Sequence, residues 1–242
     1  MRGKLYGVGV GPGAPDLITL RALRLIEAAP VIAYPAPDDG ISFARSIVSE
    51  FLRSDQIEIP IIVPMRVARF PAAEVYDVAA KEIADHLDND RDVVVLCEGD
   101  PFFYGSFMYL YERLSDAYEC EIVPGVSSIM TAAAMSGIPL AARNDVLTII
   151  PGPLPDHEMR VKIDAADALV IMKVGRHLAR IKALLADMNL LHKSIYLERV
   201  SLPEQRIMRL CDMHNDTAPY FSMITIYNGA EPWIDVAKMN VK

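Results

Sequence analysis

The chain has 242 residues, of which 52% are apolar, and its formal net charge is −8 at pH 7. It is long enough for one large α/β domain or two modest ones, and no apolar run approaches the roughly 20 residues of a membrane span. The acidic balance without a basic stripe disfavours nucleic acid as the main partner, and the lack of a signal-peptide pattern leads us to expect a cytoplasmic protein.

The first strand pattern, Lys4 to Val10, runs into a glycine-rich turn, Gly7-Val8-Gly9-Val10-Gly11-Pro12-Gly13. Glycines at alternate positions tolerate unusual dihedral angles and let another group approach the backbone closely. A helix is expected next, with Asp16 as a plausible cap and an inner face made of Leu17, Leu20, Leu23 and Ile26. The turn lacks the third glycine of a GxGxxG fingerprint and the GK[ST] of a P-loop. It is therefore either a ligand-binding loop of another kind or a purely structural turn.

Strand and helix patterns alternate along the next part of the chain. Val31 to Tyr34 and Ile57 to Val63 are predicted as strands, whereas Ser42 to Leu52 and Glu74 to Leu87 are predicted as helices. Alternation of this kind is typical of a parallel sheet with helices on both faces.

The central stretch begins with Asp92 to Cys97, an apolar, β-branched run that predicts a strand buried on both faces. It ends abruptly at Glu98-Gly99-Asp100-Pro101, a cluster of turn residues. An amphipathic helix is expected next, with Phe103, Phe107, Leu110 and Leu114 at helical spacing. Asp100 would thus lie just past the carboxyl end of a central strand, where open α/β sheets bind ligands. The alternative is that Asp100 only caps the following helix.

A further strand, Glu119 to Val123, ends at Pro124-Gly125-Val126-Ser127-Ser128, and a helix of small residues is expected from Ile129 to Ser136. Ser127 or Ser128 would cap that helix, and a helix N-terminus with two hydroxyls and free amides can also hold a polar ligand. We predict two α/β domains, residues 1–118 and residues 119–242.

The second half of the chain also contains predicted strands that end in loops. Strands are expected at Val146–Ile150, Ala168–Met172, Ser194–Leu197 and Ser222–Tyr227, a helix at His177–Leu185, and a hairpin arm at Ile207–Leu210. The closing strands lie too close together for helical crossovers, so a mixed sheet is predicted for this half.

The three cysteines lie far apart without a CxxC pair, and the five histidines are scattered without an HExxH pattern. These spacings disfavour a disulfide framework and a zinc site, and they favour buried thiols in a reducing compartment. We expect no bound metal.

Three of the strand-end loops together resemble one family. Gly7 to Gly13, followed by Asp16-Leu17-Ile18-Thr19-Leu20, is similar to the first motif of the tetrapyrrole methylases, Gly99-Asp100-Pro101-Phe102-Phe103-Tyr104-Gly105 to their second, and Pro124 to Ser128 to their third. Order and spacing both match, and the resemblance covers the whole chain. Within the family, the stretches that look most like the precorrin-2 C20-methyltransferase branch are Tyr34-Pro35, Pro64-Met65 and Cys97 to Ser106.

The resemblance implies two α/β domains with S-adenosylmethionine in the cleft between them, S-adenosylhomocysteine as a product, and a homodimer. Carried over by motif, the residues expected at the methyl donor are Gly11, Pro12, Glu98, Gly99, Asp100, Phe103, Ser127, Ser128, Met172 and Val200. The chain departs from many members of the family at Glu98, where they have a small residue.

The reaction that the resemblance implies is methyl transfer from a sulfonium to a carbon of a reduced tetrapyrrole in cobalamin biosynthesis. Aligning the two reactants is the first task of such an enzyme, and removing a proton from the methylated carbon is the second. The candidate catalytic residues are Asp100, Lys173 and Glu198, although either carboxylate could equally be a structural hydrogen-bond partner.

The substrate of such an enzyme carries many carboxylates, so local cations must line its site in spite of the negative net charge. Candidate cations at strand ends and loops are Arg66, Arg69, Arg143, Lys173, Arg176 and Arg199, and candidate hydroxyl donors are Tyr104, Tyr111 and Tyr220. The alternative for each cation is a solvated surface position, and for each tyrosine a half-buried core position.

The sequence therefore favours an S-adenosylmethionine-dependent C-methyltransferase that acts on C20 of precorrin-2 or its cobalt-containing counterpart. One alternative is another corrin-pathway methylase with a different ring position as its target. A second is a non-catalytic tetrapyrrole-binding protein, which would bind pigment without consuming the methyl donor. A nicotinamide dehydrogenase is disfavoured by the failed GxGxxG pattern.

Overall fold

The computed structural model describes residues 2–38, 40–63 and 71–236, with side chains described from residue 73 in the last range. Pro64-Met65, Arg66 and Arg69 lie outside the described residues. The chain forms two compact units, Met1–Ser128 and Ile129–Lys242. The predicted boundary between residues 118 and 119 is therefore wrong, because the strand at residues 120–123 pairs with the first strand of the chain and belongs to the first unit.

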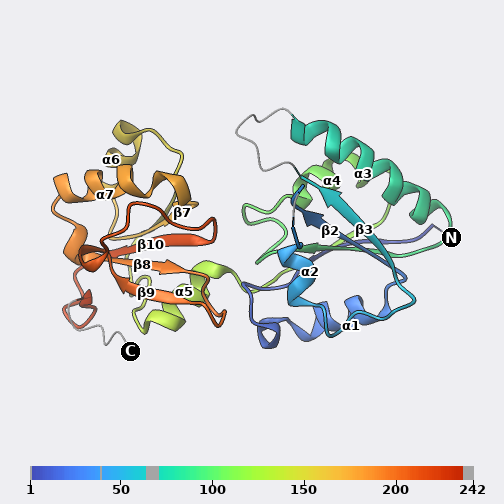
Figure 1. Cartoon of the computed structure of the whole chain (residues 1–242), viewed down its shortest axis with the longest axis horizontal. Coiled ribbons are helices and arrows are strands. Elements are labelled where there is room, and N and C mark those ends of the chain that lie inside the picture. Colours follow the sequence, from blue (N-terminus) through green and yellow to red (C-terminus); the bar gives the residue numbers. More distant parts are fainter. Residues whose placement is uncertain (1, 39, 64–70, 237–242) are drawn as a thin grey trace. The chain divides into compact units, whose positions relative to one another are not determined.

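The first unit is built on a parallel sheet of five strands in the order β3-β2-β4-β1-β5 (Figure 1). The strands are β1 (Leu5–Gly9), β2 (Val31–Ala36), β3 (Ile57–Ile62), β4 (Val93–Cys97) and β5 (Cys120–Val123). All residues of β4 are buried, as its continuous apolar run predicts for a strand covered on both faces. Every strand predicted in this half is confirmed, with boundaries that differ by a few residues at most.

Helices cover both faces of this sheet: α1 (Leu20–Ala28), α2 (Phe43–Ile47), α3 (Pro71–Asp88) and α4 (Phe107–Leu114). One core joins α1 and α2 to Val94 and Leu96, whereas the other joins α3 and α4 to Val93 and Val95. This alternation along β4 follows from the two-residue period of a strand. Figure 1 shows α3 and α4 on one side of the sheet and α1 and α2 on the other.

Three helix boundaries differ from the prediction. Asp16 lies in a short 3-10 turn, and the cap of α1 is instead Thr19, whose hydroxyl accepts a hydrogen bond from the Ala22 amide at 3.2 Å. Leu20, predicted to face inward, is therefore exposed. The helix predicted for residues 42–52 is confined to α2, and α4 begins at Phe107, so Phe103 lies in the preceding loop.

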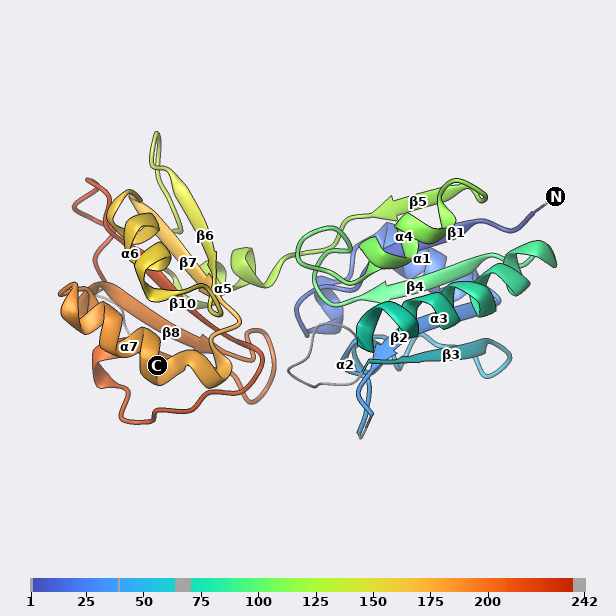
Figure 2. The same cartoon turned by 90° about the horizontal axis from the view of Figure 1, so that it is seen from above.

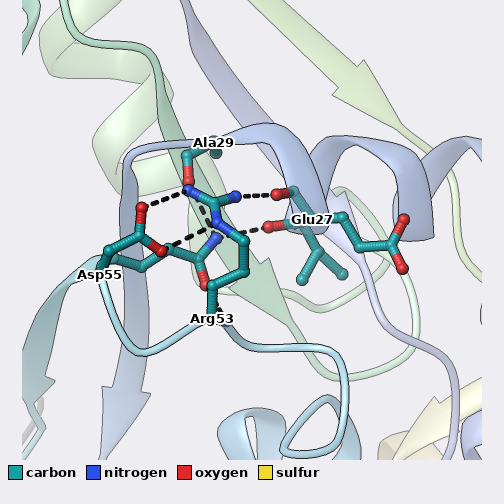
Figure 3. Close-up of polar contacts among 6 residues, drawn as sticks. Glu27, Ala29, Arg53 and Asp55 are labelled. Atoms are coloured by element: carbon teal, nitrogen blue, oxygen red, sulfur yellow. Dashed lines mark hydrogen bonds and ion pairs between the residues drawn. The ribbon is translucent and has the colours of Figure 1, made fainter.

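The carboxyl end of α1 is held by the loop before β3 (Figure 3). The Gln56 side-chain amide donates to the carbonyls of Ile26 and Ala29 at 2.7 and 2.8 Å, and Arg53 donates to the Glu27 carbonyl. Arg53 also pairs with Asp55 at 2.9 Å. These bonds satisfy carbonyls that have no partner within the last turn of a helix, and they tie α1 to the entry of β3.

The second unit contains a mixed sheet in the order β6-β7-β10-β8-β9, as predicted. The strands are β6 (Leu147–Pro151), β7 (Ala168–Met172), β8 (Ser194–Glu198), β9 (Arg206–Arg209) and β10 (Ser222–Tyr227). Only β6 and β7 pair in parallel, and β10 runs antiparallel to both β7 and β8. The predicted hairpin arm is confirmed as β9, which pairs antiparallel with β8.

The helices of this half are α5 (Ser128–Ser136), α6 (Asp156–Asp164) and α7 (Leu178–Asp187), with 3-10 turns at Gly175–His177, Leu191–Lys193 and Leu210–Asp212. Buried residues of α6 and α7 share one core with the strands, and Figure 2 shows the two helices side by side on the sheet. The sequence analysis did not predict α6.

Among the helices that the structure describes, none is long and apolar enough to cross a membrane. The three cysteines are free. Cys97 is buried, as expected, but Cys211 is exposed, so the expectation of buried thiols does not hold for all three.

Candidate active site at the strand ends

The carboxyl ends of β1 and β4 lie at the switch point of the first sheet, where the connections from two neighbouring strands leave on opposite faces. These two strands are neighbours, yet β1 leads into α1 on one face whereas β4 leads into α4 on the other. In doubly wound sheets a ligand binds outside the carboxyl ends of two strands that diverge in this way. The first two motif loops therefore begin at the position where the topology predicts a site.

The loops after β1 and β4 are joined by their backbones. The Gly99 amide donates to the Gly11 carbonyl at 2.8 Å, the Gly11 amide donates back to the Gly99 carbonyl at 3.4 Å, and the Val10 amide donates to the Cys97 carbonyl at 2.9 Å. Gly11 and Gly99 have φ values of +81° and +65°, in the region that favours glycine. A side chain at either position would strain this bridge.

The third motif loop packs onto the other two through glycine. A Cβ added to Gly125 would lie 2.0 Å from the Gly99 carbonyl oxygen, and one added to Gly9 would lie 2.5 Å from the same atom. No side chain fits in either place. These two glycines therefore make room for the backbone of a neighbouring motif loop. This supports the interpretation of Gly9 as part of a structural turn. The space beyond Gly99 is different, because a Cβ there would meet only the Val126 carbonyl oxygen, at 4.0 Å.

Asp100 connects the second and third motif loops. Its Oδ1 accepts a hydrogen bond from the Phe102 amide at 2.9 Å, and its Oδ2 accepts one from the Gly125 amide at 3.1 Å. The helix that follows begins at Phe107 after Ser106, so Asp100 does not cap it. The prediction that Asp100 lies at the strand end is confirmed, whereas the alternative of a simple helix cap is wrong.

Phe103 and Tyr104 form an aromatic pair in the loop before α4, with ring centroids 5.1 Å apart in an edge-to-face arrangement. Tyr104 has φ of +56° and is 44% exposed, whereas Phe103 is half-buried. A non-glycine residue with positive φ is strained, and such residues concentrate at functional sites. Tyr111, in contrast, contacts Phe102 and packs against the core, as its alternative interpretation predicted.

Glu98 follows β4 on the side of the sheet that carries α1 and α2. Its side chain is half-buried, and two backbone amides donate to its carboxylate, its own and that of Ala44 in the first turn of α2. Desolvation raises the pKa of this carboxyl above its ordinary value, and the hydrogen bonds from the Glu98 and Ala44 amides only partly offset that effect. In the folded chain, the Glu98 carboxylate therefore binds a proton more tightly than a surface carboxylate does.

The remaining donor candidates of the first unit lie on the same loops. Pro12 is buried beside Gly11, whereas Ser127 and Ser128 are half-buried, and Ser128 is the first residue of α5. The first unit thus brings together eight of the predicted donor residues: Gly11, Pro12, Glu98, Gly99, Asp100, Phe103, Ser127 and Ser128.

Most candidates of the second unit also share one sheet edge. Since β10 runs antiparallel to β7 and β8, its first residues lie beside the last residues of both, and Ser222 pairs with Glu198 while Met223 pairs with Met172. The Arg199 amide donates to the Phe221 carbonyl at 2.9 Å. The candidates at this edge are Met172, Lys173, Arg176, Glu198, Arg199, Val200 and Tyr220.

Glu198 is buried and already bonded on both oxygens. Tyr196 donates its hydroxyl proton to one of them, and Arg206 Nη1 lies 3.4 Å from the other. Burial, followed by the hydrogen bond to Glu198, raises the pKa of the Tyr196 hydroxyl. Tyr196 was not predicted, although its position two residues before Glu198 on one strand places both on the same face. Val200 is buried as well.

The cations at this edge reach solvent. Lys173, Arg176 and Arg199 are exposed, and both Lys173 and Arg199 have left-handed φ values, of +55° and +49°. Arg176 Nε donates to His177 Nε2 at 3.4 Å. Burial lowers the pKa of His177, and the nearby guanidinium groups of Arg180 and Arg176 lower it further, which favours the neutral ring that can accept this bond. The sequence analysis overlooked His177, whose only signal is its place next to Arg176.

Arg143, a predicted substrate contact, does not join this group. It precedes β6 and forms an ion pair with Glu231, which follows β10, at 2.9 Å. The start of β6 and the end of β10 lie at the opposite edge of the sheet from Met172 and Glu198. Among the residues that the structure describes, no group of three or more His, Cys, Asp or Glu side chains is placed to hold a metal ion.

The family model for the tetrapyrrole (corrin/porphyrin) methylases matches residues 4–210. The chain belongs to this family. It is 34% identical to a Sinorhizobium precorrin-2 C(20)-methyltransferase, over 93% of this chain and 95% of that protein, and 34% identical to a cobalt-precorrin-2 C(20)-methyltransferase of Salmonella typhimurium, over 93% and 97%. It is also 39% identical to the cobalamin biosynthesis protein CobIJ of Mycobacterium tuberculosis over 94% of its own length, but it spans only 46% of that relative.

Solved structures of methylases share the fold. The methyltransferase CobJ superposes with a TM-score of 0.70 at 22% identity, over 94% of this chain and 95% of that one. The Thermus thermophilus uroporphyrin-III C-methyltransferase, crystallised with S-adenosylhomocysteine, gives 0.66 at 23% identity, over 92% and 97%. The two-domain α/β architecture inferred from the sequence is therefore that of this family.

Proposed function

We propose that the protein is an S-adenosylmethionine-dependent methyltransferase that methylates C20 of precorrin-2, or of its cobalt-containing counterpart, in cobalamin biosynthesis. One observation carries the proposal: the three motif loops meet, backbone to backbone, at the switch point of the first sheet. The similarity over nearly full length to two C(20)-methyltransferases supports this choice of ring position.

The methyl donor is proposed to bind over the joined loops. Gly99 leaves open space where a side chain would stand, and Glu98 and Asp100 flank it with carboxylates that suit the positive charge of a sulfonium and an amino group. Gly11, Pro12, Phe103, Ser127 and Ser128 would complete this site, and Met172 and Val200 of the second unit remain proposed contacts by motif. When bound, S-adenosylmethionine supplies an electrophilic methyl group. The residues of the chain hold and orient both reactants, which can contribute several kcal/mol to catalysis.

The tetrapyrrole is proposed to bind through its carboxylates at the edge of the second sheet. Lys173, Arg176 and Arg199 are exposed cations there, and arginine in particular can bind a carboxylate through two parallel hydrogen bonds. Tyr104 and Tyr220 are exposed, and a tyrosine hydroxyl can donate a hydrogen bond to a carboxylate. Arg143 is left out of this proposal because it lies at the other edge. A homodimer, which the family resemblance implies, is proposed as the assembly and would appear as twice the chain mass in light scattering.

The test is to incubate the protein with methyl-labelled donor and precorrin-2, with and without cobalt, and to locate the label by NMR. Label at C20 is the expected result. Label at another ring position would identify a different corrin-pathway methylase. Pigment binding without consumption of the donor would indicate a carrier and contradict the proposed function. The metal-free and cobalt arms show which substrate is used.

A further inference from the structure

One buried hydroxyl, that of Ser222, lies among the segments that carry the proposed tetrapyrrole contacts of the second unit. Ser222 is the first residue of β10 and is only 4% exposed. Its Oγ donates a hydrogen bond to the Pro219 carbonyl at 2.8 Å, accepts one from the Gly175 amide at 3.2 Å, and also interacts with the Tyr196 hydroxyl. Its backbone carbonyl accepts a bond from the Val174 amide at 3.5 Å. The segment before β10 and the loop after β7 are therefore both attached to this one residue.

The loop after β7 carries two cations in a conformation that the start of β10 maintains. Lys173 has a left-handed φ of +55°, and the next two amides, of Val174 and Gly175, are the ones that bond to Ser222. Gly175 is also the first residue of the 3-10 turn that contains Arg176. A left-handed conformation costs free energy at a non-glycine residue and persists only where neighbouring contacts enforce it. Ser222 supplies such contacts directly after Lys173.

The loop after β8 depends on the same strand start. Arg199 has a left-handed φ of +49°, and its amide donates to the carbonyl of Phe221, the residue before Ser222, at 2.9 Å. Tyr220 precedes Phe221, and its carbonyl accepts a hydrogen bond from the Ser222 amide at 2.9 Å. The proposed tetrapyrrole contacts of this unit therefore lie on three segments that the first residues of β10 join.

We propose that Ser222 is a positioning residue for tetrapyrrole binding. Its hydroxyl fixes the spacing between the loop after β7, which carries Lys173 and Arg176, and the segment before β10, which carries Tyr220 and holds Arg199. This inference rests on the proposed function, because it assumes that the tetrapyrrole carboxylates bind at this edge. A rigid ring with several carboxylates requires donors at fixed separations, and donors that are already ordered bind it more tightly. Ser222 is buried and therefore acts through these side chains rather than by touching the ligand.

The decisive variant is Ser222→Ala, which removes the hydroxyl at nearly the same size, and the matched control is Ser194→Ala. Ser194 is also buried and is the first residue of β8, but it pairs with Ile226 at the opposite edge of the sheet. Its hydroxyl donates to the Leu190 carbonyl at 2.8 Å. Each variant thus loses one buried hydroxyl that bonds to a backbone carbonyl, so both should lower the melting temperature. A difference between them in ligand binding reports where the hydroxyl lies and not that it is buried.

Ser222→Ala should weaken the binding of precorrin-2, whereas Ser194→Ala should bind it like the wild type. We expect the Kd of Ser222→Ala to rise by about tenfold in a fluorescence titration, the scale of one or two lost hydrogen bonds. The Kd of S-adenosylmethionine, measured by calorimetry, should change far less in both variants. Ser222→Thr keeps a hydroxyl and should recover most of the affinity. Ser222→Cys, whose thiol forms only weak hydrogen bonds, allows the same comparison if the alanine variant is unstable.

A double variant tests whether Ser222 acts through the cations. If the hydroxyl positions Arg176, Ser222→Ala should cost less affinity in the Arg176→Ala background than in the wild type, because the side chain that it positions is already absent. Equal Kd values for precorrin-2 in Ser222→Ala and Ser194→Ala, or strictly additive losses in the double variant, would overturn the role of Ser222. Failure of the wild type to bind either the metal-free or the cobalt-containing form would instead refute the proposed function, and this inference with it.

Discussion

The carboxylate of Asp100 accepts a hydrogen bond from the backbone amide of Gly125, 3.1 Å away, across 25 positions of the chain. The other carboxylate oxygen accepts the Phe102 amide. One side chain thus fixes the loop after β4 and attaches it to the loop after β5. The conformation of both motif loops consequently depends on a negatively charged acceptor at this position.

Asp100→Asn should destabilise the protein, because an asparagine has one acceptor oxygen for two backbone donors. One amide is left facing an NH2 group. An unsatisfied donor costs about 1–3 kcal/mol when it is buried, and less for the part-buried Gly125 amide or the exposed Phe102 amide. Chemical denaturation monitored by circular dichroism should show this loss, together with weaker donor binding in calorimetry. Asp116→Asn, at an exposed position, is the matched control. Equal stability of the two variants would show that Asp100 does not clamp the loops.

Gly125→Ala should be far more harmful than Gly137→Ala. The new methyl group at position 125 would lie 2.0 Å from the Gly99 carbonyl oxygen, whereas the one at position 137 meets nothing within 4 Å. Gly137 has φ of +66°, so its variant should lose only the roughly 1–2 kcal/mol that a left-handed conformation costs an alanine. The position 125 variant must push two backbones apart and should lose donor binding as well. Melting curves and calorimetry on this pair check the packing of the motif loops.

Arg143→Ala should leave tetrapyrrole affinity almost unchanged, whereas Arg176→Ala should weaken it. Arg143 is paired with Glu231 at the other edge of the sheet, and its side chain is 81% exposed, so even its effect on stability should stay below about 1 kcal/mol. Fluorescence titration with the tetrapyrrole measures both affinities. Rising salt should weaken wild-type binding, because exposed charge pairs are screened. A larger loss of tetrapyrrole affinity in Arg143→Ala than in Arg176→Ala would contradict the proposal that the tetrapyrrole binds at the edge where Arg176 lies.

Glu58→Gln should lower the free energy of unfolding at neutral pH but not in acid. Two hydrogen bonds from Arg45, of 2.5 and 2.8 Å, lower the pKa of Glu58 below its ordinary value of 4.5. Its stabilisation is therefore fully present above pH 4.5 and is lost as the pH falls through the lowered pKa. Both side chains are about one-third exposed, so solvent screening limits the contribution to about 1 kcal/mol. Unfolding free energies of both proteins should converge in acid and differ at pH 7.

Glu98→Gln should have the opposite effect and raise the free energy of unfolding at neutral pH. Desolvation raises the pKa of Glu98 in the folded state, so the favourable contribution of this group is present below its ordinary pKa of 4.5 and is lost as the pH rises through the raised value. A neutral glutamine avoids that loss at pH 7. Thermal melts from pH 4 upward should show an advantage for the variant that grows with pH. A lower melting temperature at pH 7 would mean that the carboxylate is stabilised, not desolvated.

Much of the fold could be predicted because hydrophobic pattern and topology agree. Ala168–Met172 and Ser222–Tyr227 are strands with the predicted bounds, and the short connections in the second half correctly indicated antiparallel pairing. The three motif loops were located from their glycine and proline residues alone. Positions just after buried strands were the most reliable site predictions, since the carboxyl ends of parallel strands share one edge.

The errors arose where tertiary contacts override local pattern. Phe103 has helical spacing to Phe107, yet the close packing of Gly105 against the Pro101 carbonyl and the left-handed Tyr104 keep this stretch in a loop. Helix α6 was missed because prolines precede it and only Met159 and Ile163 are buried. The edge on which Arg143 lies depends on strand order, which the sequence does not reveal.

The contact of Gly9, Gly99 and Gly125 also determines when the motif loops lose their conformational freedom. Fixing one residue of a flexible loop costs roughly 1–2 kcal/mol of backbone entropy. Folding has already fixed these three residues, because Gly9 ends β1, Gly99 exchanges two backbone hydrogen bonds with Gly11, and the Gly125 amide donates to the Asp100 carboxylate. A ligand that arrives at the loops does not have to order them. The affinity of this half of the site should therefore depend little on loop rearrangement, and its amides should exchange with solvent slowly even in the free protein.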